Sequence, residues 1–468
     1  MQHSTVARTG GSSKGRSPRT LYSQKLPSIH PRAAGIDLGA REHWVAVSPK
    51  DKQARVRSFG CYTPDLHEMA QWLKTCGVET IAMESTGVYW VPVFEILEAY
   101  GFDVNLVDAH HVRNVSGRKS DVSDCQWLQQ LHSVGLLAAA FRPEDDICTL
   151  RTYTRQRGRF VRACADQIRL MHKALEQMNL QLHKAISDVS GVTGFKIMRA
   201  IVAGEHDPEV LVQHRHPQMK SSRATIIKAL TGNYREEHLF TLQQALELYD
   251  LFQQKIQECD TRIEAHLATF TPRATEDTIP PRRNKTKGRR RKNEPYFDLR
   301  SQLYQVAGVD LTQIDGIDAL TAQTLLSECG HTMDAFPTEK HFASWLGLCP
   351  NNRKTGGRIR SRHSRSVQNR AATALRLAAY SIHRSHSAIG AYYRRLRSRI
   401  GAPKAITATA HKLACLVYRM IKYGQHYVDI GEKAYEERFR KQRMRALLNN
   451  ARRMGYILVA EQTGEIVS

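Results

Sequence analysis

Apolar and polar positions alternate in short blocks over residues 33–140. Runs of alternating or continuous apolar residues predict strands at Ile36–Val47, Arg55–Phe59, Glu79–Glu84 and Asp103–Val107. The first run contains two strands, separated by a turn around Gly39–Glu42. Apolar stripes at helical spacing predict helices at Pro64–Thr75, Tyr89–Tyr100 and Ser120–Leu131. Three leading strands followed by this alternation predict a mixed sheet with flanking helices.

Two later segments have the apolar spacing of long helices. Residues 144–184 are expected to form one helix, whose apolar positions repeat at spacings of three and four: Val161, Cys164, Ile168, Met171, Leu175, Met178 and Leu182. Leu242–Phe270 carries a second run of this kind. Such seams are typical of coiled coils. The two runs could pair as an antiparallel hairpin, join subunits, or pack within a helical core.

The remaining chain predicts a linker, a second helical region and a basic helix. Pro280-Pro281 precedes a run in which eight of the eleven residues from Arg282 to Lys292 are Lys or Arg, which is typical of a basic linker. Helices are expected at Thr338–Leu346, Ser366–Ser385 and Pro403–Tyr423, with a Gly- and Arg-rich loop over 347–365. Residues 434–453 predict a basic helix.

Charge changes this picture most. The 468 residues carry a formal net charge of +24, with a sequence pI near 9.8. Such an excess favours a polyanionic partner, most often DNA or RNA. A membrane is not expected as a partner, because no apolar stretch approaches the roughly 20 residues that span a bilayer. The nine cysteines form no C-x-x-C pair, which fits a reducing cytoplasm.

Four carboxylates are the first candidates for chemistry. Asp37 lies in the apolar run Ala33–Gly39, and Glu84 ends the run Thr80–Glu84. Asp121 and Asp124 are three residues apart and share one helix face. Each acid alone is more simply a helix cap or a solvated charge. Together the four predict a site for Mg²⁺, which prefers hard oxygen ligands and serves phosphoryl transfer.

The string Gly35-Ile36-Asp37-Leu38-Gly39 is ambiguous by itself. It occurs in nucleases of the RNase H-like fold and resembles the first phosphate loop of actin-like ATPases. An actin-like ATPase is expected to have further Gly-rich nucleotide loops. This chain instead follows the string with a Glu-ended strand and an Asp-x-x-Asp helix, which favours the nuclease fold.

A second candidate lies in the loop after Gly347-Leu348-Cys349-Pro350. Hydroxyl groups there are embedded among guanidinium groups, which hold phosphate bidentately and neutralise developing charge. That setting could make a serine a nucleophile towards a phosphodiester. Residue chemistry alone favours a plainer interpretation, a phosphate-gripping loop with spectator serines.

Taken together, these motifs resemble the DEDD-type insertion-sequence transposases, the family of bridge-RNA-guided recombinases. The resemblance covers about residues 33–145 and 310–430. It includes Met83-Glu84-Ser85-Thr86-Gly87, Lys119-Ser120-Asp121-Val122-Ser123-Asp124, Ile314-Asp315-Gly316-Ile317 and the Gly-Leu-Cys-Pro loop. It implies a RuvC-like domain in which Asp37, Glu84, Asp121 and Asp124 bind Mg²⁺, with Mn²⁺ as an alternative. It also implies a coiled coil and a C-terminal transposase domain.

In the family, the C-terminal domain supplies a serine that becomes covalently linked to DNA. Members often place this Ser just before the glycines of the loop, where this chain has Lys354-Thr355-Gly356-Gly357. The β-branch of Thr355 crowds its hydroxyl, so Ser361 is the favoured nucleophile, with Thr355, Ser364 and Ser366 as alternatives. Nucleic acid is expected to contact a set of basic residues: Arg353, Lys354, Arg358, Arg360, Arg362, Arg365, Arg370, Arg289, Arg290, Arg291 and Lys292.

The expected fold class is α/β plus α, with an RNase H-like (RuvC-like) mixed-sheet domain, long coiled-coil helices and a mostly helical C-terminal domain. The expected divisions are a basic disordered arm (1–32), a RuvC-like domain (33–143), a coiled-coil domain (144–271), a basic linker (272–298), a serine-bearing transposase domain (299–431) and a basic C-terminal helix and tail (432–468).

The expected function is cutting and rejoining DNA as a transposase. The expected partners are donor DNA, target DNA, a structured bridge RNA and further copies of the chain in a dimer or tetramer. The expected location is the bacterial cytoplasm, at the nucleoid when the protein is active. Two alternatives remain: a metal-dependent junction resolvase or nuclease that forms no covalent intermediate, and a non-catalytic nucleic-acid-binding scaffold.

Overall fold

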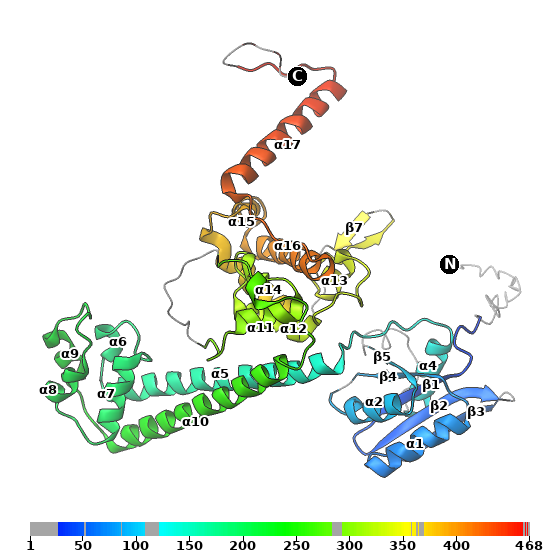
Figure 1. The fold of residues 1–468 in the computed structure, drawn as a ribbon, viewed down its shortest axis with the longest axis horizontal. Coiled ribbons are helices and arrows are strands. Elements are labelled where there is room, and N and C mark those ends of the chain that lie inside the picture. The colour runs from blue at the N-terminus through cyan, green and yellow to red at the C-terminus, as the bar shows by residue number, and fades with distance from the viewer. Residues whose placement is uncertain are drawn as a thin grey trace, which may run out of the picture. The chain divides into compact units, whose positions relative to one another are not determined.

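The computed structural model describes residues 27–50, 53–85, 87–107, 121–282, 293–356, 358–361, 364, 369–461, 464 and 466 (Figure 1). Contacts within the chain divide it into two units, Met1–Arg142 and Pro143–Ser468.

A five-stranded mixed sheet forms the centre of the first unit. Its strands are β1 (Ala33–Leu38), β2 (Glu42–Lys50), β3 (Gln53–Gly60), β4 (Thr80–Glu84) and β5 (Asp103–Val107). They lie in the order β3-β2-β1-β4-β5. The first three strands pair antiparallel, whereas β1, β4 and β5 are parallel to one another. The strands predicted from alternation are therefore present, in a mixed sheet as expected.

Helices cover both faces of this sheet. On one face, α1 (Thr63–Thr75) and α2 (Trp90–Ala99) pack against the sheet through a core that includes Leu66, Leu97, Ile36 and Ile81. On the other face, α4 (Asp121–Ser133) crosses β1, β2 and β4. Side chains alternate between the faces along a strand, so Ile36 faces α1 and α2 while its neighbours in β1 face α4.

Two long helices dominate the first part of the second unit. α5 (Asp145–Gln177) and α10 (Glu236–Leu267) lie side by side (Figure 1) and run antiparallel, since Asp146 contacts His266 whereas Cys164 contacts Gln253. The expectation of one helix over 144–184 was wrong at its C-terminal end. The chain turns at Asn179, whose φ of 54° is incompatible with a continuing α-helix.

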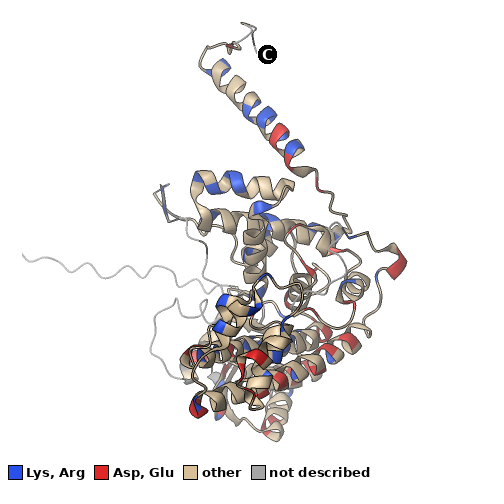
Figure 2. Ribbon diagram, turned by 90° about the vertical axis from the view of Figure 1, so that its left-hand side faces the viewer, with Lys and Arg blue, Asp and Glu red and all other residues tan. Residues whose placement is uncertain are grey.

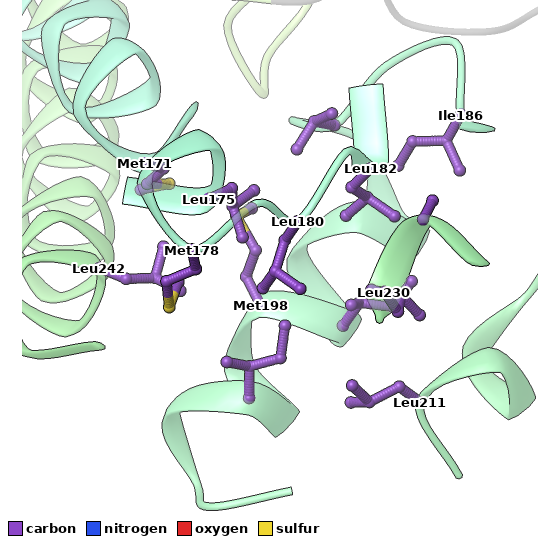
Figure 3. Close-up of a cluster of buried hydrophobic side chains, with 14 of the residues drawn as sticks. Met171, Leu175, Met178, Leu180, Leu182, Ile186, Met198, Leu211, Leu230 and Leu242 are labelled. Carbon is purple, nitrogen blue, oxygen red and sulfur yellow. The ribbon is translucent and has the colours of Figure 1, made fainter. Parts of the chain in front are cut away.

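A small helical cap joins the far ends of these two helices. It contains α6 (Leu182–Ala185), α7 (Val192–Val202), α8 (Pro208–Leu211) and α9 (Arg223–Leu230). Figure 3 shows Leu182, Met198 and Leu230 of the cap, with Leu180 just before it, converging with Leu175 of α5, and all five side chains are buried. The cap thus has its own apolar core, continuous with the ends of α5 and α10.

The rest of the second unit is mostly helical. Its helices are α11 (Leu299–Ala307), α12 (Ala319–Cys329), α13 (Glu339–Trp345), α14 (Arg370–Ser381), α15 (Ala388–Ile400), α16 (Ala402–Tyr423) and α17 (Gly431–Arg453). α14 packs on α16, and both helices bury small residues, among them Ala371, Ala378, Ala410 and Ala414. α12 also packs on α5, so the helical region is anchored to the long helix pair.

The segment after Pro350 also differs from its prediction. Residues 347–365 were expected to form a loop, but β6 (Arg353–Thr355) and β7 (Arg358–Ser361) pair there as an antiparallel hairpin. Gly356 allows the tight turn, because its φ of 56° is readily adopted only by glycine. The prediction followed the Gly and Arg content and missed the short strands on either side of the turn.

The coarse fold class, α/β followed by α, is confirmed. Within the described ranges, the helices are either too short or too polar to cross a membrane.

Candidate functional site

The carboxylates of Asp37 and Glu84 lie on neighbouring parallel strands. β1 and β4 are aligned with Gly35 opposite Ala82 and Ile36 opposite Met83, so Asp37 and Glu84 occupy the next pair of positions at the carboxyl ends of both strands. Both residues are half-buried. Because side chains two residues apart share a face, Asp37 lies on the face of Gly35 and Glu84 on the face of Ala82.

That shared face is the one covered by α4. A Cβ placed on Gly35 would lie 2.3 Å from the backbone nitrogen of Gln129 and 2.4 Å from the carbonyl oxygen of Cys125. The helix backbone therefore rests directly on β1 at this glycine. No larger residue fits there, which explains in physical terms why a Gly stands two residues before Asp37.

The direction of α4 brings its acids to the same end of the sheet. The last turn of the helix lies at the start of β4, where His132 Nε2 is 2.9 Å from Thr80 Oγ1. Its first turn therefore points to the carboxyl ends of β1 and β4. Asp121 begins the helix and Asp124 lies one turn further along. The structure brings the helix positions of the predicted Asp-x-x-Asp pair to the edge that holds the strand carboxylates.

Electrostatics links two of these groups. Burial, then the carboxylate of Asp37 and, more weakly, that of Asp124 raise the pKa of the Cys125 thiol to about 11. The Cys125 thiol is thus close enough to Asp37 and Asp124 for both carboxylates to affect its pKa, as expected if they flank the first turn of α4. The side chain of Asp121 lies outside the described residues. Among the side chains that are described, no group of three His, Cys, Asp or Glu is close enough to hold a metal ion.

The ligand chemistry at this edge nevertheless suits a hard divalent cation. The three described candidates, Asp37, Glu84 and Asp124, are all carboxylates, which are the ligands that Mg²⁺ and Mn²⁺ prefer. The approach of several like charges would be costly without a cation between them.

Trp44 also belongs to this edge and was not predicted. β2 pairs it with Asp37, so its indole lies on the face covered by α4. Its Nε1 is buried and has no hydrogen-bond partner among the described residues. The sequence indicated a turn around Gly39–Glu42, and in the structure Gly39 N donates to Glu42 O there, at 3.1 Å, which fixes the register of the two strands. Counting back from that turn places Trp44 opposite Asp37.

The second candidate centre lies on the β6–β7 hairpin of the second unit. Thr355 ends β6, is exposed, and pairs with Arg358 across the Gly356 turn. Ser361 ends β7 and pairs with Arg353; its side chain is not described. Arg358 and Arg360 are exposed on β7.

Other predicted residues of this centre divide between described and undescribed positions. Ser364 is exposed and forms an isolated bridge with Pro350. The side chains of Arg353 and Lys354 are not described, although both residues lie in β6. The remaining candidates lie outside the described residues: Arg362, Arg365, Ser366, Arg289, Arg290, Arg291 and Lys292.

Arg370 lies in a concentration of positive charge that the sequence did not indicate. It is the first residue of α14, whose N-cap Asn369 accepts a hydrogen bond from Ala372 N. Partial burial, then the positive charge of Arg155, and more weakly that of Arg162 and Arg159, lower the pKa of Arg370. Glu328, whose carboxylate is bound by Arg155, opposes this lowering, so Arg159 and Arg162 of α5 are the arginines near the start of α14 whose charge is not paired with Glu328. Like charges gathered in this way favour a polyanion.

Comparison with known proteins identifies both parts of the chain. Residues 34–180 match the family model of DEDD transposases of the IS110 type, described as a transposase, and residues 308–394 match the transposase IS116/IS110/IS902 family. A relative from Streptomyces coelicolor, the insertion element IS110 uncharacterized 43.6 kDa protein, is 30% identical over 119 residues. That alignment covers 25% of this chain and 29% of the relative, so the chain matches under a third of the relative's length.

The first model contains all four predicted acids, and the second contains the hairpin and Arg370. A DEDD-type domain implies use of a divalent metal ion. The two matches overlap the two regions that carry the resemblance, residues 33–145 and 310–430. The chain belongs to the IS110 family of DEDD-type transposases.

Proposed function

We propose that this protein is a Mg²⁺-dependent DNA recombinase that mobilises an insertion sequence under the guidance of a bridge RNA. The observation that carries the proposal is the shared edge of Asp37 and Glu84, reached by the first turn of α4 with Asp121 and Asp124. The order β3-β2-β1-β4-β5, with three antiparallel strands followed by parallel ones, supports an RNase H-like (RuvC-like) domain.

The four carboxylates would hold the divalent ion. When bound there, Mg²⁺ would neutralise phosphate charge and orient the scissile phosphodiester. The residues of the chain would do the rest. Asp37 and Glu84 would fix the ion's position from the rigid sheet, and the close contact at Gly35 would fix α4 relative to them. Mn²⁺ offers the same ligand preference and would be accepted in its place.

The hairpin would supply the nucleophile. The Oγ of Ser361 would attack phosphorus, forming a serine–phosphate ester as the bond from phosphorus to one deoxyribose oxygen breaks. The serine hydroxyl gives up its proton, and the released deoxyribose oxygen takes up a proton and leaves as a hydroxyl. The corresponding hydroxyl of another cut strand would then attack the ester, which restores Ser361 and joins the two strands. Arg358 and Arg360, exposed on β7, would hold the phosphate together with Arg362 and Arg365. Thr355 is the alternative nucleophile.

Base pairing with a structured RNA would select donor and target DNA, so the protein would contact mainly backbones. The positive charge of Arg370, Arg159 and Arg162 supports such contacts. The segment with Arg289, Arg290, Arg291 and Lys292 would add to them. α5 and α10 would form a coiled coil, and the acidic edge and hairpin would act on one phosphate within a dimer or tetramer at the bacterial nucleoid.

A junction resolvase without covalent chemistry is the second candidate. It is favoured by one observation: the acidic edge is built entirely by the first unit and needs no hydroxyl from the hairpin. In that case water would be the nucleophile. A non-catalytic scaffold is the third candidate, and it predicts nucleic-acid binding with no strand cleavage in the presence of Mg²⁺.

The first experiment isolates the full-length protein from cells that carry its flanking DNA and sequences the RNA bound to it. One discrete RNA from the element's non-coding end supports guidance, and heterogeneous RNA or none contradicts it. DNA strand exchange is then measured with that RNA and Mg²⁺. Asp37→Asn and Glu84→Gln are expected to lower its rate at least 100-fold. Glu98→Gln, on the exposed face of α2, is the matched control and should leave the rate unchanged.

A further inference from the structure

α17 carries a straight stripe of arginine and amide side chains. Arg438, Gln442, Arg445, Asn449 and Arg452 follow one another at spacings of four, three, four and three residues. This spacing places all five on one helix face, and the face drifts by only about 20° per seven residues. The stripe is about 21 Å long at 1.5 Å per residue. All five residues are exposed.

The charge of this stripe is not balanced by nearby acids. The acidic residues of α17, Glu432, Glu436 and Glu437, lie in its first seven residues, as the red bands near the base of the helix leading to the C-terminus show (Figure 2). Glu437 pairs with Lys441 at 2.7 Å, and Glu432 pairs with Arg394 and His386. In the described part of the chain, no ion pair reaches the three arginines of the stripe.

The base of α17 is fixed, whereas the stripe is not covered. The guanidinium of Arg395, on α15, lies 3.6 Å from the ring centre of Phe439 and 5.1 Å from that of Tyr435. These contacts, with the Arg394–Glu432 pair, hold the first turns of α17 on α15. From Arg440 to Leu447 every residue is exposed. A helix held at one end and exposed beyond it presents its side chains in a fixed direction.

We propose that the Arg438–Arg452 stripe is a binding surface for double-stranded DNA. Guanidinium groups contact phosphates, and Gln and Asn side chains contact base edges or phosphates. The major groove of B-DNA, about 12 Å wide, admits an α-helix. A stripe of about 21 Å is longer than this width, so a helix that crosses the groove places its end arginines at the phosphates of both strands.

The geometry selects DNA over duplex RNA. The major groove of A-form RNA is deep and narrow, and side chains on a helix cannot enter it. The stripe lies outside residues 34–180 and 308–394, so neither family match assigns it. The inference deepens the proposed function and rests on it in one respect, that the chain handles DNA.

A different occupant is possible for the opposite face of α17, and the test must separate the two. Met444, Leu447 and Ala451 form an apolar seam there, of which Met444 and Leu447 are exposed. A second copy of the chain could pair through this seam. That outcome predicts a change in oligomeric state rather than in DNA binding.

The test measures binding of the full-length protein to a fluorescent duplex of mixed sequence across a range of salt concentrations. The triple variant R438Q/R445Q/R452Q removes three charges from the stripe. The matched control K433Q/R440Q/R443Q removes three charges from exposed positions elsewhere on the same helix. The logarithm of the binding constant falls linearly with the logarithm of the salt concentration, with a slope of about 0.9 in magnitude for each phosphate contact. The stripe variant loses three such contacts, so the magnitude of its slope should fall by about 2.7.

At moderate salt this loss corresponds to a drop in affinity of tenfold or more, whereas the control should stay within about threefold. The variant R438K/R445K/R452K should retain most of the slope, because it keeps the charge and the helix. Circular dichroism checks that all variants are folded.

Equal losses in the stripe variant and its control would overturn the proposal, since general charge would then suffice. An unchanged slope in the stripe variant would also overturn it. So would a loss confined to an RNA hairpin probe, or a smaller particle in light scattering with unchanged DNA binding. The assay measures DNA binding and not strand exchange, so its result can be interpreted even if the protein lacks the proposed recombinase activity.

Discussion

The carboxylate of Glu328 on α12 accepts two hydrogen bonds from the guanidinium of Arg155 on α5, at 2.8 and 2.7 Å. The Glu328 side chain is only 8% exposed. Arg151, one turn earlier on α5, donates to the carbonyl oxygens of Ser327 and Glu328 at 3.2 and 2.9 Å. Two arginines on one helix thus fix the end of α12, and with it the helical region that carries the hairpin.

Glu328→Gln is expected to destabilise the second unit by about 2 kcal/mol, because it removes a charge-assisted bidentate contact while Arg155 keeps its charge. Urea unfolding followed by circular dichroism measures the change. Glu258→Gln is the control. Glu258 is half exposed, forms an ion pair with Lys255 and accepts a long hydrogen bond from Gln254, so its loss should cost less than about 0.5 kcal/mol. Equal midpoints for the two variants would show that the Glu328 contact adds nothing to stability.

Gly35→Ala should damage the acidic edge without touching an acid. The new Cβ would meet backbone atoms of Gln129 and Cys125 at 2.3 and 2.4 Å, so α4 must move off β1. Overpacking of this kind typically costs about 1–3 kcal/mol, and it displaces Asp121 and Asp124 from Asp37. We expect lower stability together with a large loss of metal-dependent strand exchange.

Gly158→Ala is the control for this change. Gly158 lies within α5, and a Cβ there meets nothing within 4 Å. Alanine should stabilise that helix by roughly 0.5–1 kcal/mol. If both alanine variants behave alike, the backbone of α4 does not rest directly on β1 at Gly35.

Features that depend on neighbouring residues could be predicted from the sequence, whereas features that depend on contacts between distant segments could not. The positions of Asp37 and Glu84 at strand ends could be predicted because Asp37 lies in an apolar run and Glu84 ends one, which are local signals. Trp44 was missed because its place beside Asp37 depends on strand register, and Arg155 and Arg159 were missed because they meet Arg370 only through the packing of α5. The β6–β7 hairpin was missed because two strands of three and four residues leave little periodicity to detect.

His132 should make the stability of the first unit depend on pH. Burial, and then the nearby His30, lower the pKa of His132 to about 4, although Asp103 opposes this. Its unfolded-state pKa is about 6.5. The folded form therefore keeps this imidazole neutral, and its contribution is full above pH 6.5 and is lost as the pH falls from about 6.5 to 4.

The shift corresponds to a loss of about 3 kcal/mol over that window. Four of the five tryptophans lie in the first unit, so tryptophan fluorescence in urea follows it well. His132→Gln should flatten the pH dependence between 4 and 6.5, whereas His67→Gln, at an exposed position beside Tyr100, should not. A profile that is unchanged in His132→Gln would assign the dependence to other groups.

The two candidate nucleophiles can be separated by trapping protein–DNA adducts on a nicked substrate that prevents rejoining. Ser361→Ala is expected to abolish the adduct, and Thr355→Ala to reduce it by less than tenfold through the turn at Gly356. The reverse pattern would assign the reaction to Thr355. Adducts of undiminished yield in both variants would exclude the two residues, and no adduct in the unsubstituted protein would favour the resolvase mechanism.

The pairing of Arg157 with Asp260 decides how α5 and α10 are aligned. Both side chains are buried, at 6% and 4% exposure, and Arg157 also donates to the carbonyl oxygen of Asn293 at 2.8 Å. Apolar seams that repeat every seven residues tolerate a slide of one helix along the other by one repeat, about 10 Å. Such a slide would leave two buried charges without partners, which is strongly unfavourable. This ion pair therefore fixes the axial register of α5 and α10, and with it the distance between the cap and the helices that carry the hairpin.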